Sequence, residues 1–168
     1  DIIEEGKIVV DKSPGDITKD ENGNDIEEGE PYEIWCIEDL CVFSNMVNSG
    51  SYPFYNETIR LMQNLNFKSK YSYVNGTITI DGNIKSCNSI EKLQENLTTN
   101  EGFYPIGDGK KTNSNFVGIF DGNNKSISNI YINRPDMSVG LFGITEISQN
   151  NSVIKNLSVS GNMIGNTV

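Results

Sequence analysis

Apolar residues at helical spacing mark one segment in the first third of the chain. Ile37, Leu40, Phe43 and Val47 recur every three or four residues, which places them on one face of an α-helix. Two acidic residues follow Ile37 directly and a glycine comes after the last apolar position, as expected at the start and stop of a helix. The pattern predicts a helix over residues 36–50.

Other segments carry weaker patterns. Asn88 and Glu91 form a capping-box pair ahead of apolar positions, which predicts a second short helix over 89–98. Alternating apolar residues are typical of half-buried strands. They predict strands at 58–61, 76–80, 116–120, 127–132 and 153–159.

Three segments share a single pattern of apolar residue, any residue, Asn, apolar residue, any residue, apolar residue. They are residues 62–67, 127–132 and 154–159, and the last two begin 27 residues apart. An apolar-Gly pair follows each of the last two copies, at 139–140 and 164–165. A period in the twenties with one short strand per unit is typical of a β-solenoid. The sequence therefore predicts an all-β fold of stacked parallel strands.

Aligned copies of the pattern predict which residues stack. Strands in neighbouring coils lie about 4.8 Å apart, so equivalent side chains meet. This places Ile130 over Leu157, Ile132 over Val159 and Asn129 over Asn156. The paired Asn side chains would form an amide ladder, although Asn is also an ordinary turn residue at the start of a strand.

Several motifs, in this order, resemble the GLUG-type repeat regions of bacterial cell-surface proteins. They are Phe103-Tyr104-Pro105-Ile106-Gly107, Phe116-Val117-Gly118-Ile119-Phe120-Asp121-Gly122-Asn123, Ile127-Ser128-Asn129-Ile130 and Gly140-Leu141-Phe142-Gly143. The segment from Ile37 through Gly50 to Leu61 is similar to the helix-then-strand unit that precedes such repeats. Similar regions also occur as non-catalytic parts of immunoglobulin-A-cleaving metallopeptidases.

The resemblance implies a right-handed parallel β-helix with an N-terminal helical cap. Residues 1–33 are then an acidic leader or N-terminal hairpin, and residues 34–168 the solenoid, with the cap at 36–50 and an inserted side lobe at 68–101. The pattern stops at 165–168, so we expect a piece of a longer protein whose last rung is left open. The structural repeat positions are Asn64, Gly118, Asp121, Gly122, Asn129, Ile130, Gly140, Leu141, Phe142, Gly143, Asn156 and Leu157.

Composition excludes several classes of function. The formal net charge is −10 and the isoelectric point near 4.4, and an acidic chain without a basic patch is unsuited to nucleic acid. The longest apolar runs fall far short of a membrane span of about 18 residues. We therefore expect no nucleic-acid partner and no membrane insertion.

The residues that carry chemistry are sparse. The chain has no His, which removes the commonest general base and metal ligand, and it has no HExxH motif. Four carboxylates in the repeat part are the candidates for polysaccharide chemistry: Asp108, Asp121, Asp136 and Glu146. Asp108 and Asp121 each precede Gly and read better as turn residues. We therefore expect no catalytic residues, no cofactor and no metal. The acidic stretch at 20–25 resembles a calcium-binding loop but lacks the ligands required at the first and last positions of such a loop. It predicts a hairpin turn at Asn22-Gly23 instead.

Cysteines and aromatic residues each leave two interpretations open. Cys36, Cys41 and Cys87 are interpreted mainly as buried free thiols, with one disulfide as the alternative. A set of aromatic side chains offers either a sugar-binding platform or core packing, with core packing favoured. These aromatics are Trp35, Tyr71, Tyr73, Phe103 and Tyr104.

The favoured hypothesis is a non-catalytic, adhesin-like or stalk module on the cell wall or surface of a Gram-positive bacterium. Its partners would be other domains of a longer chain and a host or cell-wall glycan or protein. The alternatives are a glycan-binding or carbohydrate-active module, and an accessory region of a larger secreted peptidase. A face that carries exposed aromatic residues or clustered carboxylates would discriminate the glycan hypothesis from the others.

Overall fold

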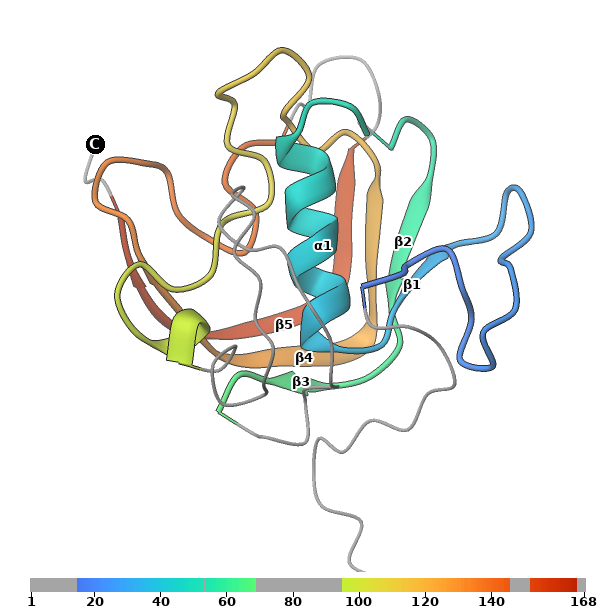
Figure 1. The fold of residues 1–168 in the computed structure, drawn as a ribbon, viewed down its shortest axis with the longest axis horizontal. Helices are drawn as coiled ribbons and strands as arrows, with labels where there is room; N and C mark the ends of the chain where they lie inside the picture. Colours follow the sequence, from blue (N-terminus) through green and yellow to red (C-terminus); the bar gives the residue numbers. More distant parts are fainter. Residues whose placement is uncertain (1–14, 53, 69–94, 146–151, 166–168) are drawn as a thin grey trace, which may run out of the picture.

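The computed structural model describes residues 15–52, 54–68, 95–145 and 152–165. They form five strands and a long helix, with a single helical turn at 95–98 (Figure 1). The elements in chain order are β1 (Tyr32–Ile34), α1 (Ile37–Asn48), β2 (Thr58–Leu61), β3 (Leu65–Asn66), β4 (Ile119–Asn133) and β5 (Val153–Ile164). The predicted helix at 36–50 is confirmed as α1, whereas the predicted strand at 76–80 and most of the second helix lie outside the described residues.

All five strands belong to one parallel sheet. β1 pairs with β2, and β2 pairs with the start of β4, so that Ile59 lies beside Phe120. β3 pairs with the middle of β4 on the same edge, where Leu65 lies beside Ile127. β5 follows β4 along its other edge. Figure 1 shows that β4 and β5 bend together, so that the sheet changes direction along their length.

The helix α1 crosses between β1 and β2 and covers one face of the sheet (Figure 1). Its first turn carries Asp39, whose carboxylate accepts hydrogen bonds from the backbone N–H of Trp35 at 2.8 Å and of Gly15 at 2.7 Å. A carboxylate at this end of a helix satisfies free N–H groups and favours the helix dipole. The helix ends before Gly50, which has a positive φ of 76°.

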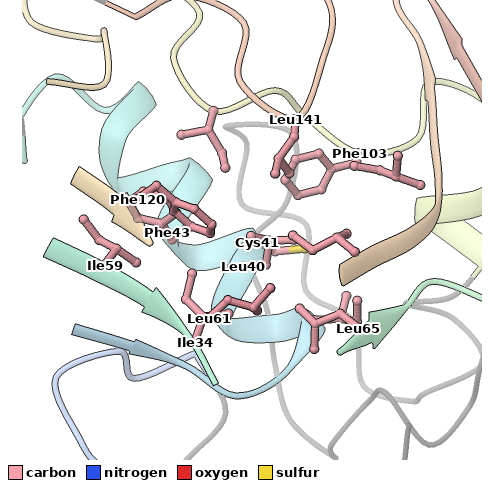
Figure 2. Close-up of a cluster of buried hydrophobic side chains, with 14 of the residues drawn as sticks. Ile34, Leu40, Cys41, Phe43, Ile59, Leu61, Leu65, Phe103, Phe120 and Leu141 are labelled. Atoms are coloured by element: carbon pink, nitrogen blue, oxygen red, sulfur yellow. The ribbon is translucent and has the colours of Figure 1, made fainter. Parts of the chain in front are cut away.

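The core lies between α1 and the sheet. Figure 2 shows Phe43 of α1 against Phe120 of β4, and their ring centroids are 5.9 Å apart in a stacked arrangement. Ile34, Leu40 and Ile59 are fully buried around them. Burial of side chains of this size contributes about 1.5–3 kcal/mol each, so this layer holds the helix on the sheet.

Segment 103–107 is hydrogen-bonded to the C-terminal half of α1. Asn48 donates to the carbonyl of Pro105 at 2.8 Å and accepts from the N–H of Gly107 at 2.9 Å. Ser44 donates to the carbonyl of Tyr104 at 2.7 Å. Both side chains are buried, and a buried amide needs such partners. These hydrogen bonds therefore hold segment 103–107 against α1.

The predicted β-helix is wrong. The described chain is a mixed α/β fold in which a parallel sheet is covered by a helix. Its strands are joined by connections of unequal length over 35–57, 62–64, 67–118 and 134–152, whereas a solenoid repeats one coil. The helix at 36–50 accordingly packs on a sheet face instead of closing the end of a coil. The repeated pattern specifies strands that pair in parallel, and this sheet satisfies it equally well.

The predicted stacking register is also wrong. Ile130 lies beside Gly161 instead of Leu157, and Ile132 lies beside Met163 instead of Val159. The sequence copies lie 27 residues apart, whereas paired residues lie 34 apart at Ile119 and Val153, 32 apart at Lys125 and Leu157, and 31 apart at Ile130 and Gly161. The strands thus pair four to seven residues away from the match between the copies. Two irregularities, between Asp121 and Lys125 and between Ile127 and Ile130, also change the register along the ladder.

Burial of the predicted core residues follows the observed order of the strands. Ile130 and Ile132 are buried, as predicted. Leu157 is half-buried and Val159 is exposed, so the prediction that all four are buried is wrong for the two residues of β5. The prediction of buried cysteines outside a disulfide is confirmed for Cys36 and Cys41, while Cys87 lies outside the described residues.

Segment 15–33 packs beside β1. An antiparallel bridge joins Lys19 to Asp25, and the N–H of Gly23 donates to the carbonyl of Asp20 at 3.0 Å. This is the hairpin turn predicted at Asn22-Gly23. Ile17 is buried in the main core, so the described part of the acidic leader is tied to the rest of the fold.

Candidate functional site

The predicted repeat positions lie mainly where the strands bend. Asp121 is buried and accepts hydrogen bonds from the N–H of Asn123 at 2.9 Å and from the amide of Asn156 at 3.4 Å. Its other oxygen lies 3.3 Å from the guanidinium of Arg60. These contacts link β2, β4 and β5 at the register irregularity between Asp121 and Lys125, which we call the first bend, so Asp121 has a structural role. The local hydrogen bond from Asn123 is present, but the predicted turn is wrong, because Asp121 and Gly122 lie inside β4 and Gly122 has no positive φ.

The predicted amide ladder between Asn129 and Asn156 is wrong, because the two amides bond to other partners. Asn129 donates to the side-chain oxygen of Asn66 at 2.8 Å and not to Asn156. Asn64 accepts from the N–H of Ser126 at 2.9 Å. Asn129 and Asn156 both have positive φ, 57° and 55°, a conformation that Asn tolerates better than most residues. Both amides therefore stabilise bends.

The glycines at predicted positions allow close approach of backbones. A Cβ on Gly122 would lie 2.4 Å from the carbonyl oxygen of Asn156, and one on Gly143 would lie 2.6 Å from that of Gly107. A Cβ on Gly118 would lie 2.6 Å from the carbonyl oxygen of Phe54, and one on Gly140 would lie 2.9 Å from that of Phe142. Leu141 is buried and Phe142 packs against the core, as Ile130 and Leu157 do from β4 and β5. None of these contacts points to a ligand.

The candidate carboxylates are dispersed. Asp108 accepts a hydrogen bond from the hydroxyl of Tyr104 at 2.7 Å, and Asp121 is engaged at the first bend. Asp136 is exposed in the loop after β4, and Glu146 lies outside the described residues. Among the residues that the structure places, no group of three potential metal ligands occurs.

The aromatic residues singled out in the sequence contribute to packing. Phe103 is buried, and its ring meets Phe67 at 5.7 Å. Tyr104 lies under the guanidinium of Arg134, 4.7 Å from ring centroid to carbon, and the indole N–H of Trp35 donates to Glu33 at 2.8 Å. Tyr71 and Tyr73 are outside the described ranges. The favoured interpretation, core packing, is confirmed for Phe103.

A different set of aromatic residues surrounds a hollow beside the loop that joins α1 to β2. The hollow has a volume of about 340 Å³, within the range of small-ligand sites. Two tyrosines at its rim are among the most exposed large side chains, Tyr52 at 52% and Tyr55 at 46%. We call it the aromatic hollow, and its lining residues are Thr18, Tyr32, Met46, Ser51, Tyr52, Phe54, Tyr55 and Glu57.

Phe54 anchors the aromatic hollow. It is buried, and its ring meets Phe43 of α1 at 5.3 Å and Tyr32 at 5.5 Å. Its backbone has a positive φ of 59°, as does that of Asn56 at 56°. A bulky residue in this region is strained by about 1–3 kcal/mol, and the ring contacts compensate for that strain. The anchored loop therefore holds Tyr52 and Tyr55 outward.

The structure gives a role to one predicted glycine beside this loop. Gly118 lets the backbone at Phe54 and Glu57 approach β4, because a Cβ would meet both carbonyl oxygens at less than 3.0 Å. The N–H of Ile119 donates to the carbonyl of Glu57 at 2.9 Å. The hollow is thus built on the sheet and not on a free loop.

The electrostatic environment of the aromatic hollow is acidic. Burial raises the pKa of the Tyr32 hydroxyl, and the Glu57 carboxylate, which accepts its hydrogen bond, raises that pKa further. A second, smaller hollow shares Tyr32 and Glu57 and is lined by three more carboxylates, Glu27, Glu28 and Glu30. Such a surface disfavours anionic ligands.

Sequence reasoning missed these residues because the helix and the strand patterns end on either side of them. A signal was present, since Tyr52, Phe54 and Tyr55 are three aromatic residues within four positions of a loop. Aromatic residues gathered in an exposed loop often bind ligands, because loops on a rigid scaffold carry function.

No family model, curated protein or solved structure matches this chain. In the described residues, no helix has the length and apolar character needed to cross a membrane. The interpretation of the site therefore rests on its geometry and chemistry.

Proposed function

We propose that this chain is a non-catalytic, adhesin-like module of a bacterial cell surface that binds a neutral glycan in the aromatic hollow. The observation that carries the proposal is the pair of exposed rings, Tyr52 and Tyr55, at the rim of a hollow that is anchored by buried Phe54. The flat apolar faces of sugar rings stack on such side chains.

The polar groups of the aromatic hollow suit the rest of a sugar. Ser51 and Thr18 offer hydroxyl groups, and the Glu57 carboxylate is a strong hydrogen-bond acceptor. A sugar presents hydroxyl donors around an apolar ring, and this combination of a few polar groups with aromatic walls is typical of small-ligand sites. The acidic surroundings favour a neutral glycan over sialylated or sulfated ones.

The surface location comes from the resemblance of the motifs at 103–107, 116–123 and 140–143 to GLUG-type regions. It is proposed together with the binding function. The stalk and peptidase-accessory hypotheses make no use of exposed aromatic residues, so the aromatic hollow favours the glycan-binding form of the adhesin hypothesis.

The test is a glycan array followed by calorimetry on the full chain. A neutral glycan should bind, and Tyr52→Ala or Tyr55→Ala should weaken binding about tenfold each, which corresponds to the roughly 1.4 kcal/mol of a lost ring contact. Tyr52→Phe keeps the ring and should bind within about twofold of the wild type, on the same grounds. The purified chain should release no reducing ends from the glycan that it binds.

The matched control is Ile144→Ala, which removes an exposed apolar side chain on another loop and should leave binding unchanged. The proposal fails if no neutral glycan binds. It also fails if the tyrosine variants bind as well as the Ile144 variant.

A further inference from the structure

Strand β5 differs from the other strands in having one neighbour and little cover. In the part of the chain that the structure describes, its only partner in the sheet is β4. Ten of its 12 residues are exposed, and only Leu157 and Met163 are half-buried. Exposed large apolar side chains gather here, since Val153, Ile154, Val159 and Ile164 all belong to β5. Figure 1 places β5 on the opposite side of β4 from β2 and β3.

The inner face of β5 continues the core. Ile154 lies beside Phe120, Val159 beside Ile127 and Met163 beside Ile132, and these three residues of β4 are fully buried. Residues in register on neighbouring strands face the same side of the sheet. Ile154, Val159 and Met163 are therefore the outermost row of a core layer that a further strand would extend.

The edge of β5 is long and carries little charge. Natural edge strands are short, or carry proline and several charges. The strand Val153–Ile164 is 12 residues long and contains no proline, and Lys155 is its sole charged residue. The chain as a whole has a net charge of −10, so most of its surface repels a second copy, whereas β5 does not.

We propose that β5 pairs with β5 of a second copy, antiparallel, about a two-fold axis at Ser158. This pairing is self-complementary, because a two-fold interface brings the same patch together from both copies. On the inner face Leu157 would meet Val159, and Ile154 would meet Met163. On the outer face Val153 would meet Ile164.

The bends and charges of β5 suit this arrangement. Asn156 of one copy would lie opposite both Ser160 and Gly161 of the second copy. One residue opposite two is the arrangement found in a β-bulge. Lys155 would lie beside Asn162, and the two lysines would be roughly 20 Å apart along the strands. That separation exceeds the Debye length of about 8 Å at physiological salt, so the like charges would not oppose association.

The pairing would be reversible. An interface confined to one strand edge is at the low end of specific interfaces, below about 1,200 Å² in total. The dimer should therefore dissociate on dilution. It would carry two aromatic hollows, but it does not depend on what they bind.

The test is sedimentation velocity of the full chain over a concentration series. The wild type should pass from monomer to dimer. The V153E/I164E variant, which brings acidic side chains opposite each other on the outer face, should weaken dimerisation at least tenfold. The V153E/I164K variant places opposite charges in the same pairs and should restore it. Ile144→Glu, at an exposed apolar residue away from β5, should leave it unchanged.

Both double variants alter the outer face and not the core layer, so their melting temperatures should stay close to that of the wild type. Four results would overturn the proposal: a strict monomer at the highest concentration, growth beyond dimers, an unaffected V153E/I164E dimer, or equal loss in both double variants. The last result would exclude the antiparallel register, because only that register sets residue 153 opposite residue 164.

Discussion

Strands β4 and β5 carry nearly the same pattern of apolar residues, yet one is buried and the other exposed. Ile127 of β4 is fully buried, while its neighbour Val159 in β5 is 36% exposed. β4 is flanked by β2 and β3 on one edge and by β5 on the other. β5 has β4 alone among the described strands.

The comparison separates the orientation of a strand, which its sequence pattern specifies, from the burial of its side chains, which depends on the neighbouring strands. Alternating apolar residues determine which face of a strand turns toward the core. How much area each side chain buries depends on the elements around it, and the free energy follows that area. Apolar residues that lie side by side in β4 and β5 therefore differ in energy, although both belong to copies of the same pattern.

The largest expected difference is between Ile127→Ala and Val159→Ala. The first leaves a cavity in the core and should cost about 2–5 kcal/mol of unfolding free energy. The second shortens a side chain at the open edge and should cost less than about 1 kcal/mol. Denaturant unfolding of both variants measures the two values. Equal costs would mean that β5 is as well covered as β4, contrary to the fold described above.

The next largest loss of unfolding free energy is expected for a substitution of Asp121, at the first bend. Asp121→Ala leaves the Asn156 amide and the N–H of Asn123 without their acceptor, and loss of such a buried partner costs about 1–3 kcal/mol. Asp136→Ala, at an exposed carboxylate in the following loop, is the control and should change little. A comparable loss of unfolding free energy in both variants would show that the contacts of Asp121 at the bend contribute nothing specific.

The contribution of Asp121 should also depend on pH. Burial by itself raises its pKa, but hydrogen bonds from Asn123, Asn156 and Arg60 outweigh burial and lower the pKa below its ordinary value. A lowered pKa stabilises the fold above the unfolded value of about 3.9 and loses that effect as pH falls through the folded value. The difference in stability between wild type and Asp121→Ala should thus be full at neutral pH and shrink below about pH 4.

The smallest expected effect is at Asn129, which lies at the second register irregularity of β4, between Ile127 and Ile130. Asn129→Ala removes the hydrogen bond to Asn66 and places Ala at positive φ, for a cost of about 1–2 kcal/mol. Asn129→Gly loses the same bond but accepts the conformation, and it should be the more stable variant of the two. Thermal melts of the pair separate backbone conformation from hydrogen bonding. The reverse order would show that the left-handed conformation of Asn129 is unimportant.

The local features of this protein follow from its sequence. Helical spacing of Ile37, Leu40, Phe43 and Val47 specifies α1, because the period of an amphipathic helix is set by its own geometry. Asn22-Gly23 specifies a hairpin turn, because glycine accepts a positive φ. The repeated pattern specifies strands that pair in parallel, and these strands are observed in β4 and β5.

Only the tertiary structure determines the strand order, the register and the site. The order β1-β2-β4 places Ile59 beside Phe120, 61 residues apart in sequence, and no local pattern encodes so distant a pair. The register between β4 and β5 depends on irregularities at Asp121–Lys125 and Ile127–Ile130, and a single inserted residue shifts all later pairs. The aromatic hollow arises because α1, β1 and the loop before β2 converge on Phe54. Each of these features is a sum over contacts between distant segments, whereas a sequence pattern reports only the conformation of its own neighbourhood.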